Sequence, residues 1–174
     1  SGDVYMISTN QLDSATQALA DTAMGYPSVA HFNGDDALIL VNGTDTIDVI
    51  GTPGVDPGSS WTVGTGSTAN HTLVRKATVD MGSTDWTVGA TEWDVNTQNT
   101  WTYAGAHTSN CVSAVTGCNE LFFSEYSEGS SNHKYIEIYN PTANTVSLNT
   151  YTVYQSGNGG SYTNTFTTNA MLAS

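Results

Sequence analysis

Apolar and polar residues alternate with a period of two along most of the chain, which is the spacing of side chains on the two faces of a β-strand. On this pattern we expect strands at 4–7, 37–41, 46–50, 71–75, 77–79, 120–126, 134–139, 146–148, 151–154 and 162–166. Short strands that recur roughly every 8–12 residues between Gly, Asn and Pro turns are typical of a β-sandwich. The hydrophobic pattern therefore predicts an all-β fold.

The residues between these runs predict the connections. Asn42-Gly43 separates two β-rich runs and indicates a two-residue hairpin turn, because both central positions of such a turn need positive φ angles. Pro53 and Pro57 indicate a loop over 51–58, and the glycines of 157–160 indicate a turn before the last strand.

One segment departs from the period of two. The apolar residues that recur there at helical spacing are Leu12, Ala15, Leu19 and Ala23. Thr9 or Asn10 could cap the N-terminus of such a helix, and Gly25 could end it. We therefore expect one short amphipathic helix over 13–24 that packs on the sheets, and a loop is the alternative.

The charge balance limits the partners. The 174 residues include 16 acidic and 3 basic side chains, so the formal net charge is -13. Such a field repels phosphate backbones and anionic lipid surfaces, which argues against nucleic-acid binding. No apolar run approaches the roughly 20 residues that span a bilayer, so we expect no membrane insertion. Charged residues make up only 11% of the chain, and a surface built instead from Ser, Thr, Asn and Gly indicates an extracellular or cell-surface protein.

The chain contains two cysteines, Cys111 and Cys118. A zinc site would need two further ligands, and no histidine lies at metal-binding spacing from them. We expect a disulfide that closes a small loop, which implies an oxidising compartment; a pair of free thiols is the alternative. Both cysteines fall within 104–118, a small and polar stretch without periodicity that we interpret as a linker.

Three carboxylates lie close together on the predicted hairpin over 120–139, namely Glu125, Glu128 and Glu137. Ca²⁺ prefers oxygen ligands, so these residues could form a calcium site; a solvated sheet face is the alternative. Asp35 and Asp36 could also bind a cation, but an Asn-Gly-Asp-Asp run is more commonly a turn. Neither set has EF-hand spacing, and we expect no cofactor to be required.

The sequence lacks the common catalytic motifs. It has no Gly-x-Ser-x-Gly, no His-Glu-x-x-His and no phosphate-binding loop followed by lysine, so we expect a protein that is not an enzyme. Four tryptophans could form a carbohydrate-binding face, although large aromatic side chains are more commonly packed in a core. They are Trp61, Trp86, Trp93 and Trp101.

Residues 121–141 resemble the opening of a bacterial lamin-tail domain. They read Leu-Phe-Phe-Ser-Glu-Tyr-Ser-Glu-Gly-Ser-Ser-Asn-His-Lys-Tyr-Ile-Glu-Ile-Tyr-Asn-Pro. Domains of this family begin with a strand, a Ser-Glu-Tyr, a Glu-Gly-Ser-Ser-Asn-Asn-Lys loop and an Ile-Glu-Ile-Tyr-Asn strand, and His133 stands where asparagine is usual. The resemblance implies an immunoglobulin-like β-sandwich.

The rest of the family pattern lies earlier in the chain. Residues 2–7 resemble the family's middle strand, and 31–38 carry its Phe-Asn-Gly-Asp-Asp-Ala motif. Residues 172–174 resemble the stretch that normally leads into that middle strand. The resemblance covers roughly 1–103 and 119–174, and the second half of the domain therefore precedes the first.

This order requires the two halves to complete each other, because a sandwich that lacks several strands exposes apolar faces and unpaired edges. Segment 119–174 could close on segment 1–103 of the same chain. It could also complete the next copy in a head-to-tail array, which we favour because it asks less of the linker. The apolar residues expected at this interface are Tyr5, Ile7, Phe122, Tyr126, Ile136 and Ile138.

The expected function follows from this incompleteness. We expect a non-enzymatic structural subunit or repeat of an extracellular filament or cell-surface array, whose copies are joined by β-strand complementation. The partner would be a second copy of the same chain. The alternative is an adhesive or carbohydrate-binding appendage domain of a larger secreted protein, which should be monomeric and carry an exposed Trp or Tyr platform.

Overall fold

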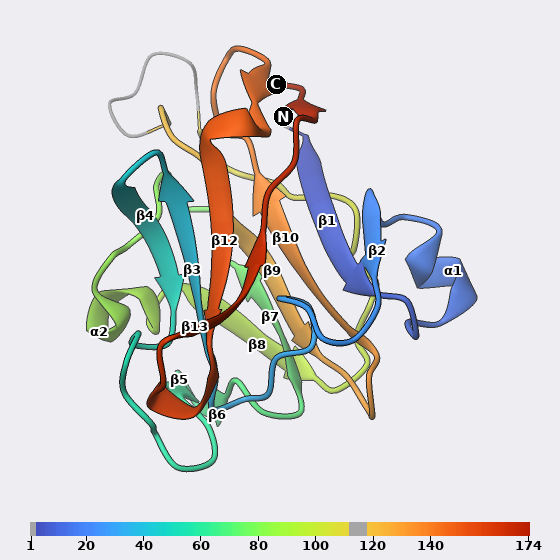
Figure 1. The fold of residues 1–174 in the computed structure, drawn as a ribbon. Coiled ribbons are helices and arrows are strands. Elements are labelled where there is room, and N and C mark those ends of the chain that lie inside the picture. Colours follow the sequence, from blue (N-terminus) through green and yellow to red (C-terminus); the bar gives the residue numbers. More distant parts are fainter. Residues whose placement is uncertain (1–2, 112–117) are drawn as a thin grey trace.

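Strands make up most of the regular secondary structure in the part of the chain that the computed structural model describes, residues 3–111 and 118–174 (Figure 1). The helical elements of this part are very short: α1 (Ser14–Gln17), α2 (Trp86–Gly89) and the 3-10 turns η1 (Leu148–Thr150) and η2 (Gly157–Gly159). The protein is therefore mostly β, with several antiparallel sheets, as the period of two predicts.

The larger sheet has six strands. Their spatial order is β2 (Thr22–Met24), β1 (Val4–Thr9), β10 (Lys134–Tyr139), β9 (Phe122–Glu128), β7 (His71–Arg75) and β8 (Trp93–Thr97). Neighbouring strands are antiparallel except β1 and β2, which are parallel. The two strands in the middle, β10 and β9, both come from segment 119–174.

The second large sheet has four strands, and two small strand pairs complete the fold. The order of the large sheet is β13 (Tyr162–Phe166), β12 (Tyr151–Ser156), β3 (Ala37–Asn42) and β4 (Asp45–Ile50). The small pairs are β5 (Thr62–Val63) with β6 (Gly66–Ser67), and β11 (Val146–Ser147) with β14 (Met171–Leu172).

Both large sheets contribute to one hydrophobic core. Ile7 and Ile136 of the six-stranded sheet belong to the same buried cluster as Leu40 and Val153 of the four-stranded sheet. Alternate residues of β10 point to the opposite face, where Tyr135 packs with Met6 and Leu12 under loop segments. The centre of the larger sheet is therefore buried on both faces.

Segments 1–103 and 119–174 share both large sheets within one chain. Strand β10 pairs with β1, β9 pairs with β7, and β12 pairs with β3. In Figure 1 the beginning of β1 lies next to the C-terminal end of the chain, and the Asp3 backbone N–H donates to the Ala173 carbonyl at 3.4 Å. Asp3 and Ala173, which would be close in sequence if the chain followed the usual lamin-tail order, are therefore neighbours in space.

Most of the predicted strands lie where the pattern places them. The predicted hairpin is present, because β3 and β4 pair, but its two turn residues are Gly43 and Thr44 rather than Asn42 and Gly43: Asn42 still pairs with Asp45 as the last residue of β3, and Gly43 has a φ of 61°. The predicted strand at 77–79 is wrong, because this stretch forms a turn in which the Val79 N–H donates to the Lys76 carbonyl.

The predicted helix over 13–24 is largely wrong. Only α1 is helical, and its N-cap is Asp13, whose carboxylate accepts from the Ala15 N–H at 3.0 Å. The chain then returns to the open edge of β1, where the Asp21 N–H donates to the Met6 carbonyl and β2 begins. Pairing with this edge satisfies backbone groups that a longer helix would leave unpaired on β1, and Leu19 remains 51% exposed.

The predicted disulfide is present between Cys111 and Cys118, whose Cα atoms lie 5.8 Å apart. The residues between them, 112–117, lie outside the described residues. Among the described residues from Gln98 to Leu121 there is no strand or helix.

Candidate functional site

A polar groove with a volume of about 330 Å³ lies at the junction of the two segments. Its walls are formed by neutral and charged polar side chains together with one exposed aromatic ring. Segment 1–103 contributes Tyr26, His31, Asn33 and Asp36, and segment 119–174 contributes Asn132, Lys134, Gln155, Asn158, Thr163 and Asn164. Neither segment could form this groove alone.

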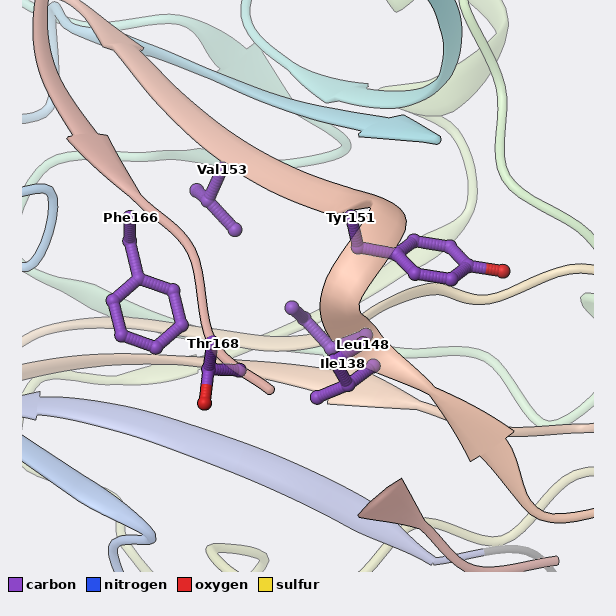
Figure 2. Close-up of a pocket in the computed structure, with 6 residues that line it drawn as sticks. All are labelled: Ile138, Leu148, Tyr151, Val153, Phe166 and Thr168. Atoms are coloured by element: carbon purple, nitrogen blue, oxygen red, sulfur yellow. The ribbon is translucent and has the colours of Figure 1, made fainter. Parts of the chain in front are cut away.

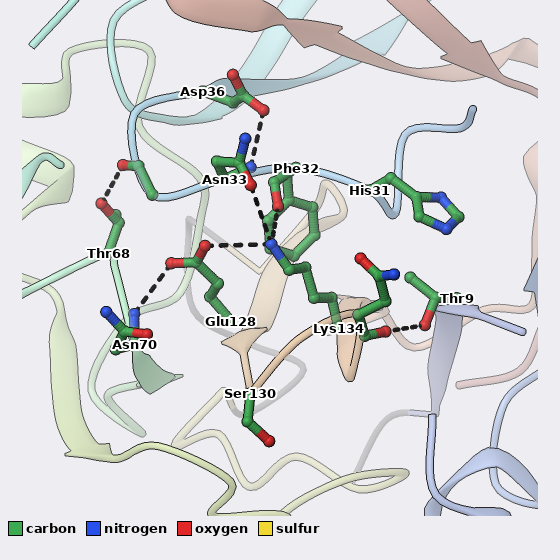
Figure 3. Close-up of polar contacts among 12 residues, drawn as sticks. Thr9, His31, Phe32, Asn33, Asp36, Thr68, Asn70, Glu128, Ser130 and Lys134 are labelled. Atoms are coloured by element: carbon green, nitrogen blue, oxygen red, sulfur yellow. Dashed lines mark hydrogen bonds and ion pairs between the residues drawn. The ribbon is translucent and has the colours of Figure 1, made fainter. Parts of the chain in front are cut away.

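Lys134 is the buried cation of the groove, and its ammonium group is fully occupied (Figure 3). Its Nζ donates to the Phe32 carbonyl at 2.6 Å, to Asn33 Oδ1 at 3.2 Å and to Glu128 Oε1 at 3.2 Å. Since an ammonium group has three donors, these contacts use all of them. Lys134 therefore fixes the loop before β3 against the start of β10.

Asp36 is the buried carboxylate of the groove and is held in a similar way. It accepts from the Asn33 N–H at 2.8 Å and from Gln155 Nε2 at 2.7 Å through one oxygen. Its other oxygen accepts from the Asn158 N–H at 3.1 Å. Asp36 therefore connects the loop before β3 to the hairpin between β12 and β13, and it acts as a turn residue rather than as a cation ligand.

Tyr26 and His31 form the rim of the groove. The Tyr26 ring is 80% exposed and meets the His31 ring edge-on, with 5.4 Å between centroids. Burial lowers the pKa of His31, and the charge of Lys134 lowers it further, so this imidazole is neutral at pH 7.

The sequence pattern alone does not single out Tyr26. The signal that could have found it is its position between Gly25 and Pro27, which indicates a surface loop.

Glu125 and Glu137 are buried directly opposite each other on β9 and β10. Tyr135 Oη donates to Glu125 at 2.6 Å, while Glu137 accepts from Ser124 Oγ at 2.9 Å and from the Gly105 N–H at 2.7 Å. Burial raises the pKa of Glu125 to about 8, helped by the charge of Glu137, and burial raises the pKa of Glu137 to about 7. The pair is therefore suited to hold a proton near neutral pH.

The third glutamate of the predicted calcium site, Glu128, has separate partners. It forms an ion pair with Lys134 at 3.2 Å and accepts from the Asn70 N–H at 3.0 Å. In residues 3–111 and 118–174, no group of three or more His, Cys, Asp and Glu side chains could hold a metal ion. The structure thus does not bring Glu125, Glu128 and Glu137 together as one ligand set.

The tryptophans do not form an exposed platform. Trp61, Trp86 and Trp93 are at most 9% exposed, and Trp101 is partly buried against the cluster of Met6, Leu12 and Tyr135. The Trp61 Nε1–H donates to the Asp36 carbonyl at 3.2 Å, which is how a buried indole satisfies its polar group. These residues serve the core, in agreement with the alternative that the sequence left open.

The six residues expected at the interface between the halves are all buried within the chain, with at most 7% exposure. Four of them form pairs between the two segments: Tyr5 lies opposite Ile138, and Ile7 lies opposite Ile136. Tyr126 also lies opposite Ile136, and Phe122 lies opposite Tyr139. In a single copy these residues therefore join segment 1–103 to segment 119–174 or pack beside that junction.

An apolar gap lies near β12 and β13 (Figure 2). The side chains around it are Ile138, Leu148, Tyr151, Val153, Phe166 and Thr168. Its volume is only about 10 Å³, room for one water molecule at most. We interpret it as a packing gap, and the groove at Tyr26 remains the better candidate for a ligand.

Comparisons with protein-family models, curated proteins and solved structures found nothing that matches this chain. Within the described ranges, no helix has the length and hydrophobicity needed to cross a membrane.

Proposed function

We propose that this chain is a non-enzymatic structural subunit of an extracellular filament or cell-surface array. In this proposal the fold is an immunoglobulin-like β-sandwich of the lamin-tail type with its halves in reversed order. Segment 119–174 of one copy completes segment 1–103 of the next, so the contacts described within one chain are made between neighbours.

The observation that carries the proposal is the position of β9 and β10 between β1 and β7. Without these strands, β1 and β7 would each expose an unpaired edge, and the apolar face that includes Ile7 and Leu73 would meet water. Segment 1–103 therefore needs the strands of a segment 119–174, whichever chain supplies them.

The linker supports an exchange between chains. Every strand pair between the segments could be formed equally by two copies, and the only covalent connection between the segments is the stretch around Cys111 and Cys118. Such an exchange keeps all sheet contacts and changes only the path of the linker. A head-to-tail exchange need not close into a ring, and an exchange that stays open propagates into a filament.

A cross-strand disulfide distinguishes exchange from closure. Val41 on β3 lies opposite Thr152 on β12, so a Val41→Cys/Thr152→Cys variant joins the two segments covalently. If copies exchange segments, non-reducing electrophoresis of the assembled protein should show a ladder of linked chains. The matched control is Val41→Cys/Thr46→Cys, whose two positions are paired within segment 1–103 and can link only inside one chain.

Electron microscopy gives the second measurement. The purified chain should form filaments whose number increases with protein concentration. A protein that stays monomeric at high concentration, and whose Val41→Cys/Thr152→Cys variant links only within one chain, would contradict the proposal.

A further inference from the structure

The groove beside Tyr26 combines an exposed aromatic ring with neutral hydrogen-bonding groups, and we propose that it binds a neutral carbohydrate chain. This inference does not depend on the assembly of copies, because the groove is formed wherever the two segments meet.

The aromatic ring is the first element of the site. Tyr26 is 80% exposed, although an aromatic ring of this size is normally buried at least in part. The edge-on contact with His31, at 5.4 Å between centroids, supports the ring on one side. The flat faces of sugar rings carry C–H groups, which pack well against the electron-rich face of an aromatic ring.

The charged groups of the groove are not available to a ligand. Lys134 uses its three donors on Phe32, Asn33 and Glu128. Asp36 accepts hydrogen bonds from Asn33, Gln155 and Asn158. A charged ligand would have to break these buried contacts, whose loss is costly. The groove therefore favours a ligand without charge.

The remaining polar groups suit hydroxyls. Asn132, Asn158, Thr163 and Asn164 line the groove from segment 119–174, and Asn33 lines it from the other side. An amide side chain offers both donors and an acceptor, as the hydroxyl groups of a sugar also do. Asn132 and Asn164 are positioned by hydrogen bonds of their Nδ2 atoms, to Gln11 at 2.7 Å and to Gln155 at 2.6 Å. These contacts orient the amides before a ligand arrives.

Size and overall charge agree with this ligand class. A volume of about 330 Å³ lies at the lower end of the range of small-molecule sites, which suits a short stretch of a sugar chain. The net charge of -13 repels polyanions, so an acidic polysaccharide should bind less well than a neutral one.

Calorimetric titration of the full chain tests the proposal. The neutral probes are the hexasaccharides of β-1,4-linked glucose, of β-1,4-linked mannose and of β-1,4-linked N-acetylglucosamine, and polygalacturonate is the acidic comparison. At least one neutral probe should bind with a micromolar to millimolar dissociation constant. Tyr26→Ala should weaken binding by roughly tenfold or more, because it removes the stacking surface.

Matched variants distinguish the loss of the Tyr26 ring from a general effect of substitution on binding. Tyr26→Phe keeps the ring and should retain binding, and Tyr103→Ala removes another half-exposed tyrosine outside the groove and should change nothing. The proposal is overturned if none of the three neutral probes binds at millimolar concentration. It is also overturned if Tyr26→Ala binds as well as the unchanged protein, or if polygalacturonate binds more tightly than every neutral probe.

Discussion

Ile7 on β1 lies directly opposite Ile136 on β10, and both side chains are completely buried in the shared core. The two residues belong to different segments of the chain, and their contact is one of a series that runs along the β1–β10 pair. Burying one such side chain contributes about 1.5–3 kcal/mol relative to leaving it in water. Each segment thus depends on the other for a large part of its stability.

The first prediction concerns truncation. A fragment of residues 1–107 should be insoluble or unfolded, because it lacks the two middle strands of the six-stranded sheet. Co-expression of a separate 119–174 fragment should restore a soluble complex, since the strand pairs themselves need no covalent link. Solubility and circular dichroism of both preparations measure this. Cooperative unfolding of soluble 1–107 alone would contradict the prediction.

The second prediction concerns a buried ion pair between the two sheets. Arg75 Nη2 lies 3.1 Å from Asp48 Oδ1, and both side chains are fully buried. Asp48 also accepts from the Phe123 N–H at 2.9 Å, so it links β4 to β9. Arg75→Met leaves this carboxylate without its cation and should lower the free energy of unfolding by about 3–5 kcal/mol.

Urea denaturation measures this change. Lys76→Met is the matched control, because this neighbouring cation is partly exposed and bonds a single carbonyl, that of Thr91. It should change the free energy of unfolding by less than about 0.5 kcal/mol. If both substitutions lowered the free energy of unfolding by the same amount, the buried Arg75–Asp48 pair would contribute no more to stability than an exposed cation.

The third prediction concerns pH. Burial raises the pKa of Glu137 from 4.5 to about 7 and that of Glu125 to about 8. Between these values and the ordinary pKa, the folded protein holds protons that the unfolded chain has released. The contribution of the pair is therefore fully present below pH 4.5 and is lost as the pH rises through 7 to 8, by up to about 1.4 kcal/mol per pH unit for each proton.

Glutamine variants remove this titration. Glu137→Gln and Glu125→Gln should each make the free energy of unfolding decline less steeply between pH 5 and 8. The free energy of unfolding of each variant should therefore rise relative to that of the unchanged protein as the pH increases. Urea denaturation at three pH values in this window measures the slopes. Asp94→Asn is the control, because Asp94 is exposed on β8 and should leave the slope unchanged. A variant slope as steep as that of the unchanged protein would exclude a proton held by the pair.

The fourth prediction concerns the linker. Replacing Cys111 and Cys118 by serine removes a cross-link between residues seven positions apart and should lower the free energy of unfolding by about 2.4 kcal/mol, the loop-entropy value for a ring of this size. The unchanged protein should take up no alkylating reagent before reduction and two equivalents after it, as measured by intact mass. Alkylation without reduction would show free thiols.

Only part of the candidate site could be predicted from the sequence. The pattern singled out Asp36, for which it favoured a turn over a cation site, and Glu128, which it placed in a calcium site because it could not show that Lys134 already binds this carboxylate. Tyr26 carried no chemical motif. A groove built by loops of both segments depends on which distant side chains meet, and spacing along the chain does not contain that information.

Local patterns were sufficient for the class of structure and for most strands. The period of two and the hairpin between β3 and β4 depend on interactions between near neighbours, so they can be recognised from residue order, although the turn lies at Gly43-Thr44, one residue later than predicted. The helix beyond Gln17 could not be excluded in this way, because the competing partner is the backbone of β1, to which the chain returns only in the folded state. The same holds for the pairing of Ile7 with Ile136: residue order shows that both strands need a partner, and packing in three dimensions selects which one they meet.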